Sequence, residues 1–315
     1  MYKNKKIAVV VPSFNEETQI SKVITTMPDY VDHIIIIDDK STDNMAAVVE
    51  EYCKTNPKIV LIRHEINQGV GGSIATGYKW ARDHECDATA VMAGDGQMDP
   101  NDLAELLDPV VSSEVDYSKA NRLIYAKAYE IVPKVRFWGN AILSLLTKIA
   151  SGYWHISDSQ TGYTVINLKA LQIIDWDLMY KRYGQPNDLL VRLNIHNFKV
   201  RDIPQKPVYN VGEQSKLKIR KAIFTISILL LRKFFWRLKE KYIIRDFHPL
   251  VFFYFFGFFS LGCSFLFSIR FFRLWFVNGE VPEVTLILLL FMLAGGVQAI
   301  FLAMWMDQDY NKELR

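Results

Sequence analysis

Two long uncharged segments constrain the fold of this 315-residue chain more than any other feature of its sequence. Leu250 to Ile269 contains twenty residues, eight of them Phe, and Val284 to Met306 contains twenty-three. A helix of about twenty apolar residues crosses the ~30 Å hydrocarbon core of a bilayer. We therefore expect two transmembrane helices rather than the buried helices of a soluble domain.

The segment before these helices is basic and amphipathic. Between Lys216 and Arg245 it holds ten Lys or Arg and a single acid, Glu240, interleaved with Ile, Leu, Phe and Trp. Helices of this kind lie on anionic membranes, where each cation adds about 1 kcal/mol. The many Phe and Ile argue against nucleic acid, the other common partner of a basic segment. Because cations mark the inner side, we expect a multi-pass protein of the cell (inner) membrane with both termini and the catalytic part in the cytoplasm.

The first part of the sequence alternates short apolar runs with helical segments. Strands are expected at 7–11, 34–37, 59–62 and 88–93, and a polar cluster and then a helix follow each of them. This alternation predicts a mostly parallel α/β sheet with helices on both faces. The polar clusters then meet at the carboxyl edge of the sheet, where open α/β folds bind ligands.

From Asp116 onward the pattern becomes α+β. We expect a strand that ends at Arg122, a helix over 136–150, a strand over 164–167 and an edge strand over 199–203. The expected domains are a catalytic domain at 1–212, basic interface helices at 213–248, and two transmembrane helices with a short tail at 249–315.

The stretch Met92 to Pro100 carries the clearest chemical signal. Asp95 and Gln97 stand one residue apart on a Gly-flanked turn, directly after the fourth expected strand. A carboxylate and an amide placed in this way supply two oxygen ligands to a hard cation. The alternative is a structural strand-to-helix turn, with Asp99 as the helix cap and Pro100 in the first turn.

Two other site types are disfavoured. The three cysteines are scattered without metal-ligand spacing, which indicates a reducing compartment and no zinc site. The loop Gly69 to Ile74 begins like a dinucleotide fingerprint, but Ile74 occupies the third glycine position and the loop follows the third strand. Its glycines are expected to allow a close approach of the backbone to the sheet edge or to a nucleotide.

Taken together, six segments in order resemble a family-2 glycosyltransferase with the GT-A fold. The resemblance is to the branch that transfers a sugar to a polyprenyl phosphate, which includes the dolichol-phosphate mannosyltransferases, and it covers roughly residues 5 to 220. The segments are 9–17, 37–43, 67–75, 93–97, 158–163 and 209–216. The main departure is Ala93, which stands where the family usually has the first Asp of its metal motif.

The resemblance implies a role for each of these segments. Asp95, Asp158 and Arg122 would be catalytic, with Asp158 orienting or deprotonating the acceptor, although a structural loop cap is an equal alternative. Asp95 and Gln97 would hold Mg²⁺ or Mn²⁺. The nucleotide sugar would lie against Pro12, Phe14, Glu16, Ile37, Asp39, Ala93, Gly94 and Asp95. The acceptor phosphate would meet Arg136, Lys216, Lys218 and Arg220.

The implied reaction is the inverting transfer of a sugar from a UDP- or GDP-linked donor to dolichyl or undecaprenyl phosphate at the cytoplasmic membrane face. A processive polysaccharide synthase is an alternative, but the Gln-x-x-Arg-Trp motif of those enzymes is absent from the sequence. A catalytically inactive membrane scaffold is a second alternative, suggested by Ala93. The expected partners are the nucleotide sugar, the polyprenyl phosphate and membrane lipids but no nucleic acid. The sequence leaves open a homo-oligomer, the sugar and the chain length of the lipid.

Overall fold

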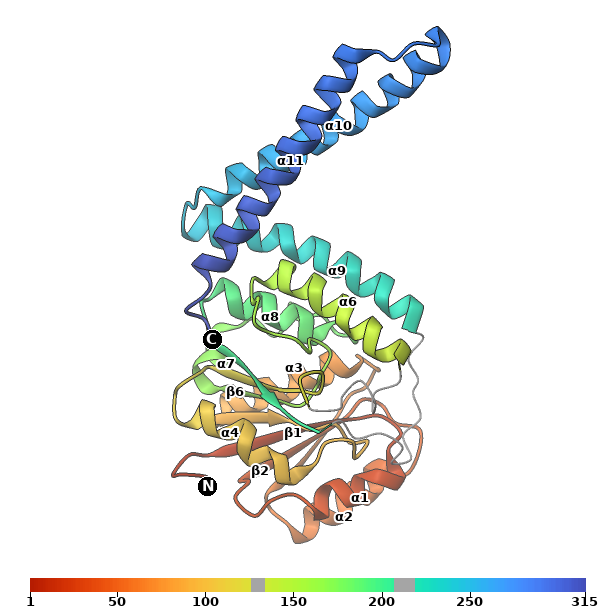
Figure 1. Cartoon of the computed structure of the whole chain (residues 1–315). Helices are drawn as coiled ribbons and strands as arrows, with labels where there is room; N and C mark the ends of the chain where they lie inside the picture. Colours follow the sequence, from red (N-terminus) through yellow and green to blue (C-terminus); the bar gives the residue numbers. More distant parts are fainter. Residues whose placement is uncertain (126–133, 207–218) are drawn as a thin grey trace. The chain divides into compact units, whose positions relative to one another are not determined.

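The computed structural model describes residues 1–125, 134–206 and 219–315 of the chain, which is drawn in Figure 1. The chain forms two compact units. The first contains Met1–Phe234 and Leu314–Arg315, and the second contains Phe235–Glu313.

Four parallel strands form one half of the sheet in the first unit. The strands are β1 (Ile7–Ser13), β2 (His33–Asp38), β3 (Ile59–Arg63) and β4 (Ala88–Val91). The elements that follow them in turn are α1 (Glu17–Thr25), α2 (Met45–Thr55), α3 (Val70–Asp83) and, after β4, the 3-10 turn η1 (Pro100–Asp102) with α4 (Leu103–Val111). The predicted strand–helix alternation is confirmed. The loops after these strands therefore share the carboxyl edge of the sheet.

The other half of the sheet contains the antiparallel strand β6 (Thr164–Asn167), which pairs with β4 and with β5 (Tyr117–Asn121). The expected edge strand is β7 (Val200–Pro204), which pairs in parallel with β5, so the order among the described strands is β3-β2-β1-β4-β6-β5-β7. The helices of this half are α6 (Lys134–Ser151), α7 (Leu168–Ile173) and α8 (Gln185–Ile195). On β7, the Val200 N–H donates to the Leu314 carbonyl at 3.0 Å, and Leu314 packs against the core.

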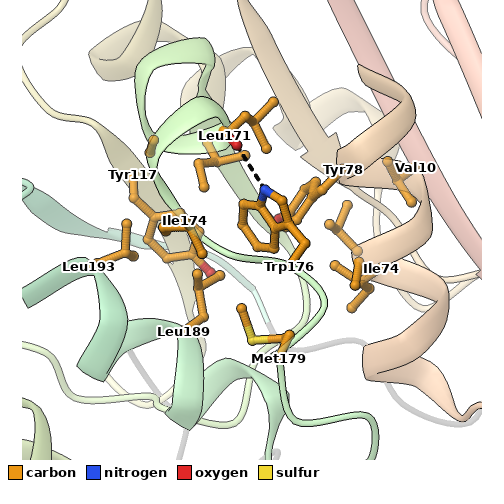
Figure 2. Close-up of a cluster of buried hydrophobic side chains, with 14 of the residues drawn as sticks. Val10, Ile74, Tyr78, Tyr117, Leu171, Ile174, Trp176, Met179, Leu189 and Leu193 are labelled. Atoms are coloured by element: carbon orange, nitrogen blue, oxygen red, sulfur yellow. Dashed lines mark hydrogen bonds between the residues drawn. The ribbon is translucent and has the colours of Figure 1, made fainter. Parts of the chain in front are cut away.

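Alternating residues of β1 divide the apolar core between the two faces of the sheet. Val9 and Val11 belong to the cluster that also contains buried residues of α1, α2 and α4. Val10 belongs to the opposite cluster, where Tyr78 of α3 packs on Trp176 with ring centroids 4.8 Å apart (Figure 2). The sheet is therefore buried on both sides, and the loops at the strand ends are where a ligand can reach it.

Close packing explains the glycines at the start of α3. A Cβ added to Gly71 would lie 2.2 Å from the Tyr180 carbonyl oxygen. The N–H groups of Gly71 and Gly72 donate to the Lys181 carbonyl at 3.0 and 3.2 Å. The expected close approach is thus present, but it is made to the chain's own segment around Lys181.

We predict that Gly71→Ala destabilises the first unit by about 1–3 kcal/mol, because the new methyl group overlaps backbone atoms that cannot rotate away. Thermal unfolding of the purified protein in detergent measures this effect. Gly139→Ala in α6 is the control, since its Cβ would meet only Ile223 Cδ1 at 3.7 Å, an ordinary contact. Equal melting temperatures for the two variants would contradict the prediction.

The second unit contains the two predicted membrane helices, α10 (Leu250–Asn278) and α11 (Glu283–Tyr310). Both are long and apolar enough to cross a bilayer, and only 28% and 17% of their most apolar stretches are buried, unlike the core helices of soluble proteins. Small residues let the two helices approach each other: a Cβ on Gly257 would lie 2.6 Å from Ile300 Cγ1 and 3.1 Å from the Gly296 carbonyl.

A buried polar cluster lies at one end of this helical pair. Arg237, near the end of α9 (Ile219–Lys239), makes a two-pronged ion pair with Asp307 at 2.8 and 2.9 Å. Tyr242 in the π-helical turn η2 (Glu240–Arg245) also donates to Asp307, and Lys241 donates to Asn311 at 2.7 Å. This cluster anchors η2 and the end of α9 to α11.

The prediction that the cations of 216–245 lie along the membrane is wrong for three of them. Arg237 and Lys241 are buried in the polar cluster just described, and Lys233 pairs with the buried Asp188 of α8 at 2.7 Å. The reason is their spacing of four residues, which places all three on one helical face. Arg232, Lys239 and Arg245 are exposed.

Candidate functional site

The loops after β1 and β2 are bound to each other by side chains that contact the opposite backbone. Asn15, which has a φ of 55°, accepts from the Thr42 N–H at 2.7 Å, while its own N–H donates to the Ser41 hydroxyl at 3.0 Å. The Glu17 N–H donates to the Asp43 carboxylate at 3.0 Å. The two loops therefore form one pre-organised wall at the carboxyl edge.

Asp39 connects this wall to the loop after β3. One carboxylate oxygen accepts from the Gln68 N–H and the other from the Gly69 N–H, both at 2.7 Å. His64 Nδ1 lies 2.8 Å from the same carboxylate, and the Asn67 amide donates to the Asp39 carbonyl at 3.0 Å. Asp39 is buried, so its observed function is to hold loops together. Its predicted contact with the nucleotide base stays a prediction.

The other residues predicted to bind the nucleotide differ in accessibility. Phe14 and Glu16 are half-buried in the loop after β1, where a ligand can reach them. Pro12 is buried, and its carbonyl accepts from Gly94 at 3.3 Å. Ile37 is fully buried in the core, so its side chain does not reach the edge.

The Asp95 loop projects from the end of β4. The Gln97 N–H donates to Asp95 Oδ1 at 3.1 Å, which orients the carboxylate in a tight turn, and Gly96 has a φ of 71°. Gly94 lies against β1, where an added Cβ would be 2.5 Å from Ser13 Oγ. The Ala93 N–H is directed to the Met98 sulfur at 3.2 Å. Strand packing thus fixes the base of this loop and leaves Asp95 and Gln97 half-buried at its tip.

The donor atoms of this loop suit a hard divalent cation. One carboxylate and one amide oxygen are too few for an all-protein cage, and the described residues contain no cluster of three or more His, Cys, Asp or Glu able to hold a metal. Mg²⁺ sites in nucleotide enzymes are commonly of this incomplete kind, because substrate phosphates supply further ligands. The residues therefore fit a metal that binds together with a nucleoside diphosphate. The predicted cap is confirmed: Asp99 accepts from the Asn101 N–H at 2.9 Å.

Two of the predicted catalytic residues, Arg122 and Asp158, form a direct ion pair. Arg122 follows β5, and its Nε lies 2.8 Å from Asp158 Oδ2 while its terminal nitrogen lies 3.2 Å from Oδ1. The Arg122 side chain is 29% exposed, whereas that of Asp158 is fully buried. Solvent therefore reaches the Arg122 side chain and not the Asp158 carboxylate.

Electrostatics argue against Asp158 as a proton acceptor. Burial raises the pKa of this carboxyl, but the positive charges of Arg122 and Lys119 outweigh burial and lower the pKa to about 2. An effective general base has a pKa closer to the working pH. The observed arrangement is that of a carboxylate which orients Arg122.

We predict that Asp158 contributes about 2 kcal/mol to the free energy of unfolding above pH 4, because its pKa is lower in the folded chain than the ordinary value of 3.8. This contribution is fully present above the unfolded pKa and is lost as the pH falls toward 2. The measurement is denaturant unfolding in detergent between about pH 2.5 and pH 5. Asp158→Asn should flatten the pH dependence by that amount, and parallel curves would contradict the prediction.

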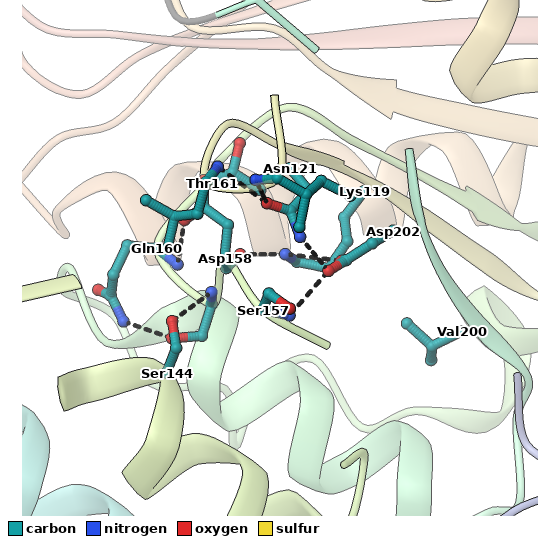
Figure 3. Close-up of polar contacts among 12 residues, drawn as sticks. Lys119, Asn121, Ser144, Ser157, Asp158, Gln160, Thr161, Val200 and Asp202 are labelled. Atoms are coloured by element: carbon teal, nitrogen blue, oxygen red, sulfur yellow. Dashed lines mark hydrogen bonds and ion pairs between the residues drawn. The ribbon is translucent and has the colours of Figure 1, made fainter. Parts of the chain in front are cut away.

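Sequence reasoning missed the polar side chains that support this pair. Lys119 and Asn121 are buried on β5, Asp202 lies on β7, and Ser144 and Thr147 of α6 contact the Ser159 hydroxyl at 3.4 and 3.2 Å. Figure 3 shows Lys119, Asn121, Ser144 and Asp202 around the loop that carries Asp158. The available signal was a lysine within an otherwise buried strand, since buried lysines are rare unless they are paired.

The structure describes the residues predicted to bind the acceptor phosphate only in part. Lys216 and Lys218 lie outside the described residues. Arg136 and Arg220 belong to α6 and α9, but their side chains lie outside the described part of the structure. Their role stays a prediction.

Comparison with known proteins identifies the relatives of this chain. The family model described as "Glycosyl transferase family 2" matches residues 8–174. The chain is 30% identical to the UDP-N-acetylglucosamine--dolichyl-phosphate N-acetylglucosaminyltransferase of Methanococcus voltae over 65% of its own length and 87% of the relative. It is 24% identical to the polyprenol monophosphomannose synthase of Mycolicibacterium smegmatis, over 71% and 86% respectively.

The fold is similar to that of a solved glycosyltransferase. Glucosyl-3-phosphoglycerate synthase from Mycobacterium tuberculosis, crystallised with Mn²⁺, UDP and glucosyl-3-phosphoglycerate, matches with a TM-score of 0.53 and 16% identity. The match covers 74% of this chain and 80% of that structure. This likeness confirms the predicted GT-A type of fold and says nothing about the substrate.

Proposed function

The chain belongs to glycosyl transferase family 2, and we propose that it transfers a sugar from a nucleotide sugar to a polyprenyl phosphate at the membrane. One observation carries the choice of a lipid acceptor: two exposed apolar helices, α10 and α11, follow a glycosyltransferase domain in the same chain. Such an anchor keeps the enzyme beside an acceptor whose tail stays in the bilayer, whereas a soluble acceptor gives no reason for one. The relatives named for dolichyl-phosphate and polyprenol substrates support the same choice.

In this proposal an oxygen of the lipid phosphate attacks the anomeric carbon, and the nucleoside diphosphate leaves from the opposite face. The attacking oxygen is anionic at neutral pH, so no general base is needed, in agreement with the low pKa of Asp158. Arg122, oriented by Asp158 and partly exposed, would pair with phosphate charge. A divalent ion held by Asp95 and Gln97 would neutralise the diphosphate leaving group, a contribution of several kcal/mol.

In this proposal the domains keep the boundaries predicted from the sequence. Residues 1–212 form the catalytic domain, and residues 213–248 form the helices that lie at the membrane surface. Two helices of the first unit support a membrane-facing surface. Trp138, Ile142 and Leu145 are exposed on α6, and Phe224 and Leu231 are exposed on α9. Gly139 of α6 lies against Ile223 of α9, which makes the two helices neighbours. Their apolar faces suit the headgroup boundary of a bilayer.

We predict that the purified protein in detergent converts one nucleotide sugar of a panel into an organic-extractable product on a short-chain polyprenyl phosphate. The panel contains radiolabelled UDP-N-acetylglucosamine, UDP-glucose and GDP-mannose. One sugar per lipid supports the proposal, whereas a growing polymer would indicate a processive synthase. No lipid-linked product from any donor would refute the function.

The same assay tests the metal site. Asp95→Asn and EDTA should each reduce turnover at least ~100-fold, because both remove the charge that stabilises the leaving group. Asp102→Asn is the matched control, a nearby acid for which the structure gives no side-chain bond to the Asp95 loop. Turnover within about threefold of wild type after either treatment would show that the site is wrongly assigned.

We predict that the start of α10 and the end of α11 lie on the cytoplasmic side and that the turn between the two helices lies outside, because the basic segment precedes α10. In a variant whose three native cysteines are replaced by serine, a cysteine at Glu280 should react with an impermeant reagent in intact cells. A cysteine at Lys312 should react only after the cells are opened. The reverse pattern would overturn the topology.

A further inference from the structure

A second buried ion pair holds the two elements that supply Arg122 and Asp158. Asp202 on β7 lies 3.3 Å from Lys119 Nζ on β5 and accepts from the Ser157 N–H at 2.8 Å. The Lys119 ammonium also donates to the main-chain carbonyl of Asp158 (Figure 3). Lys119 and Asp202 thus contact the loop of Asp158 at two successive residues.

The same pair controls the chain around Arg122. The Asn121 amide nitrogen donates to Asp202. The Asn121 side-chain oxygen Oδ1 accepts from the Leu123 N–H at 2.9 Å and from the Ile124 N–H at 3.2 Å. Asp202 therefore fixes the backbone on both sides of Arg122 as well as the start of the Asp158 loop.

Stability alone does not account for these charges. Lys119 is fully buried and the Asp202 side chain is 8% exposed, so both charges have lost their hydration. Apolar residues of similar volume often give equal or greater stability at such positions. A device that fixes the relative position of two loops does need directional bonds, which apolar contacts do not provide.

We propose that Lys119 and Asp202 are positioning residues for the transfer reaction, which place the Arg122–Asp158 pair against the phosphate charge of the reacting groups. This inference rests on the proposed function. Neither residue touches the substrate, and both act through the loop and the strand end that they bind.

The test is the double variant Lys119→Met with Asp202→Asn, assayed as the full-length protein in detergent. Removing both charges leaves no unpaired buried ion, so we expect a melting temperature within a few degrees of wild type. We expect kcat to fall about 100-fold, the loss that a displacement of ~1 Å at a reacting group causes. The KM for the nucleotide sugar should change less than about twofold, because the loops after β1 to β3 are held by other contacts.

The control is the neighbouring ion pair between Arg201 of β7 and Glu114, 2.5 Å apart with side chains 39% and 55% exposed. Arg201→Met with Glu114→Gln should leave kcat and KM unchanged. A double variant at 119 and 202 with kcat within about threefold of wild type would overturn the positioning role, as would a loss of activity that only follows a loss of folded protein. The proposed function fails only if the wild-type protein itself forms no lipid-linked sugar. Failure of the positioning role is therefore distinguishable from failure of the proposed function.

Discussion

The hydrogen bonds of the buried Asp39 carboxylate are the interactions on which the carboxyl edge of the sheet depends. Parallel strands deliver their loops to one edge, but nothing in the sheet itself fixes those loops relative to one another. Asp39 accepts from two backbone N–H groups of the loop after β3 and has His64 beside it. A buried charge is tolerated only with such complete pairing. These hydrogen bonds therefore hold the loops after β2 and β3 together without any ligand.

The parallel half of the fold could be predicted because its signals are local. Continuous β-branched runs such as Ile34 to Ile37 favour buried strands, and the Gly-flanked Asp95 marks a strand end. The pairing of Arg122 with Asp158 could not be read in this way. The two residues are 36 positions apart, and only the antiparallel β6 and the edge strand β7 bring their segments together. The family resemblance pointed to both residues, but only the structure shows that the buried Asp158 orients the partly exposed Arg122.

In the basic segment, composition alone does not show which cations are exposed and which are buried. Its composition predicts a membrane surface, which stays a prediction for exposed cations such as Arg232, whereas Lys233 and Arg237 form ion pairs inside the protein. Counting charges cannot separate the two groups, because the distinction depends on the acids that meet each helical face. Asp188 and Asp307 are distant in sequence from these cations, and both are buried. One helix can thus present exposed cations on one face and form internal ion pairs on another.

The bond between the Val200 N–H and the Leu314 carbonyl has a consequence for any shortened form of the chain. The first unit is discontinuous in sequence, since it takes up Leu314 and Arg315 after the whole of the second unit. A fragment that stops before α10 would leave β7 with an unprotected N–H and an uncovered apolar patch at a sheet edge. Such edges recruit strands from other molecules. The residues after α11 therefore complete the edge of a sheet that was formed more than a hundred residues earlier in the chain.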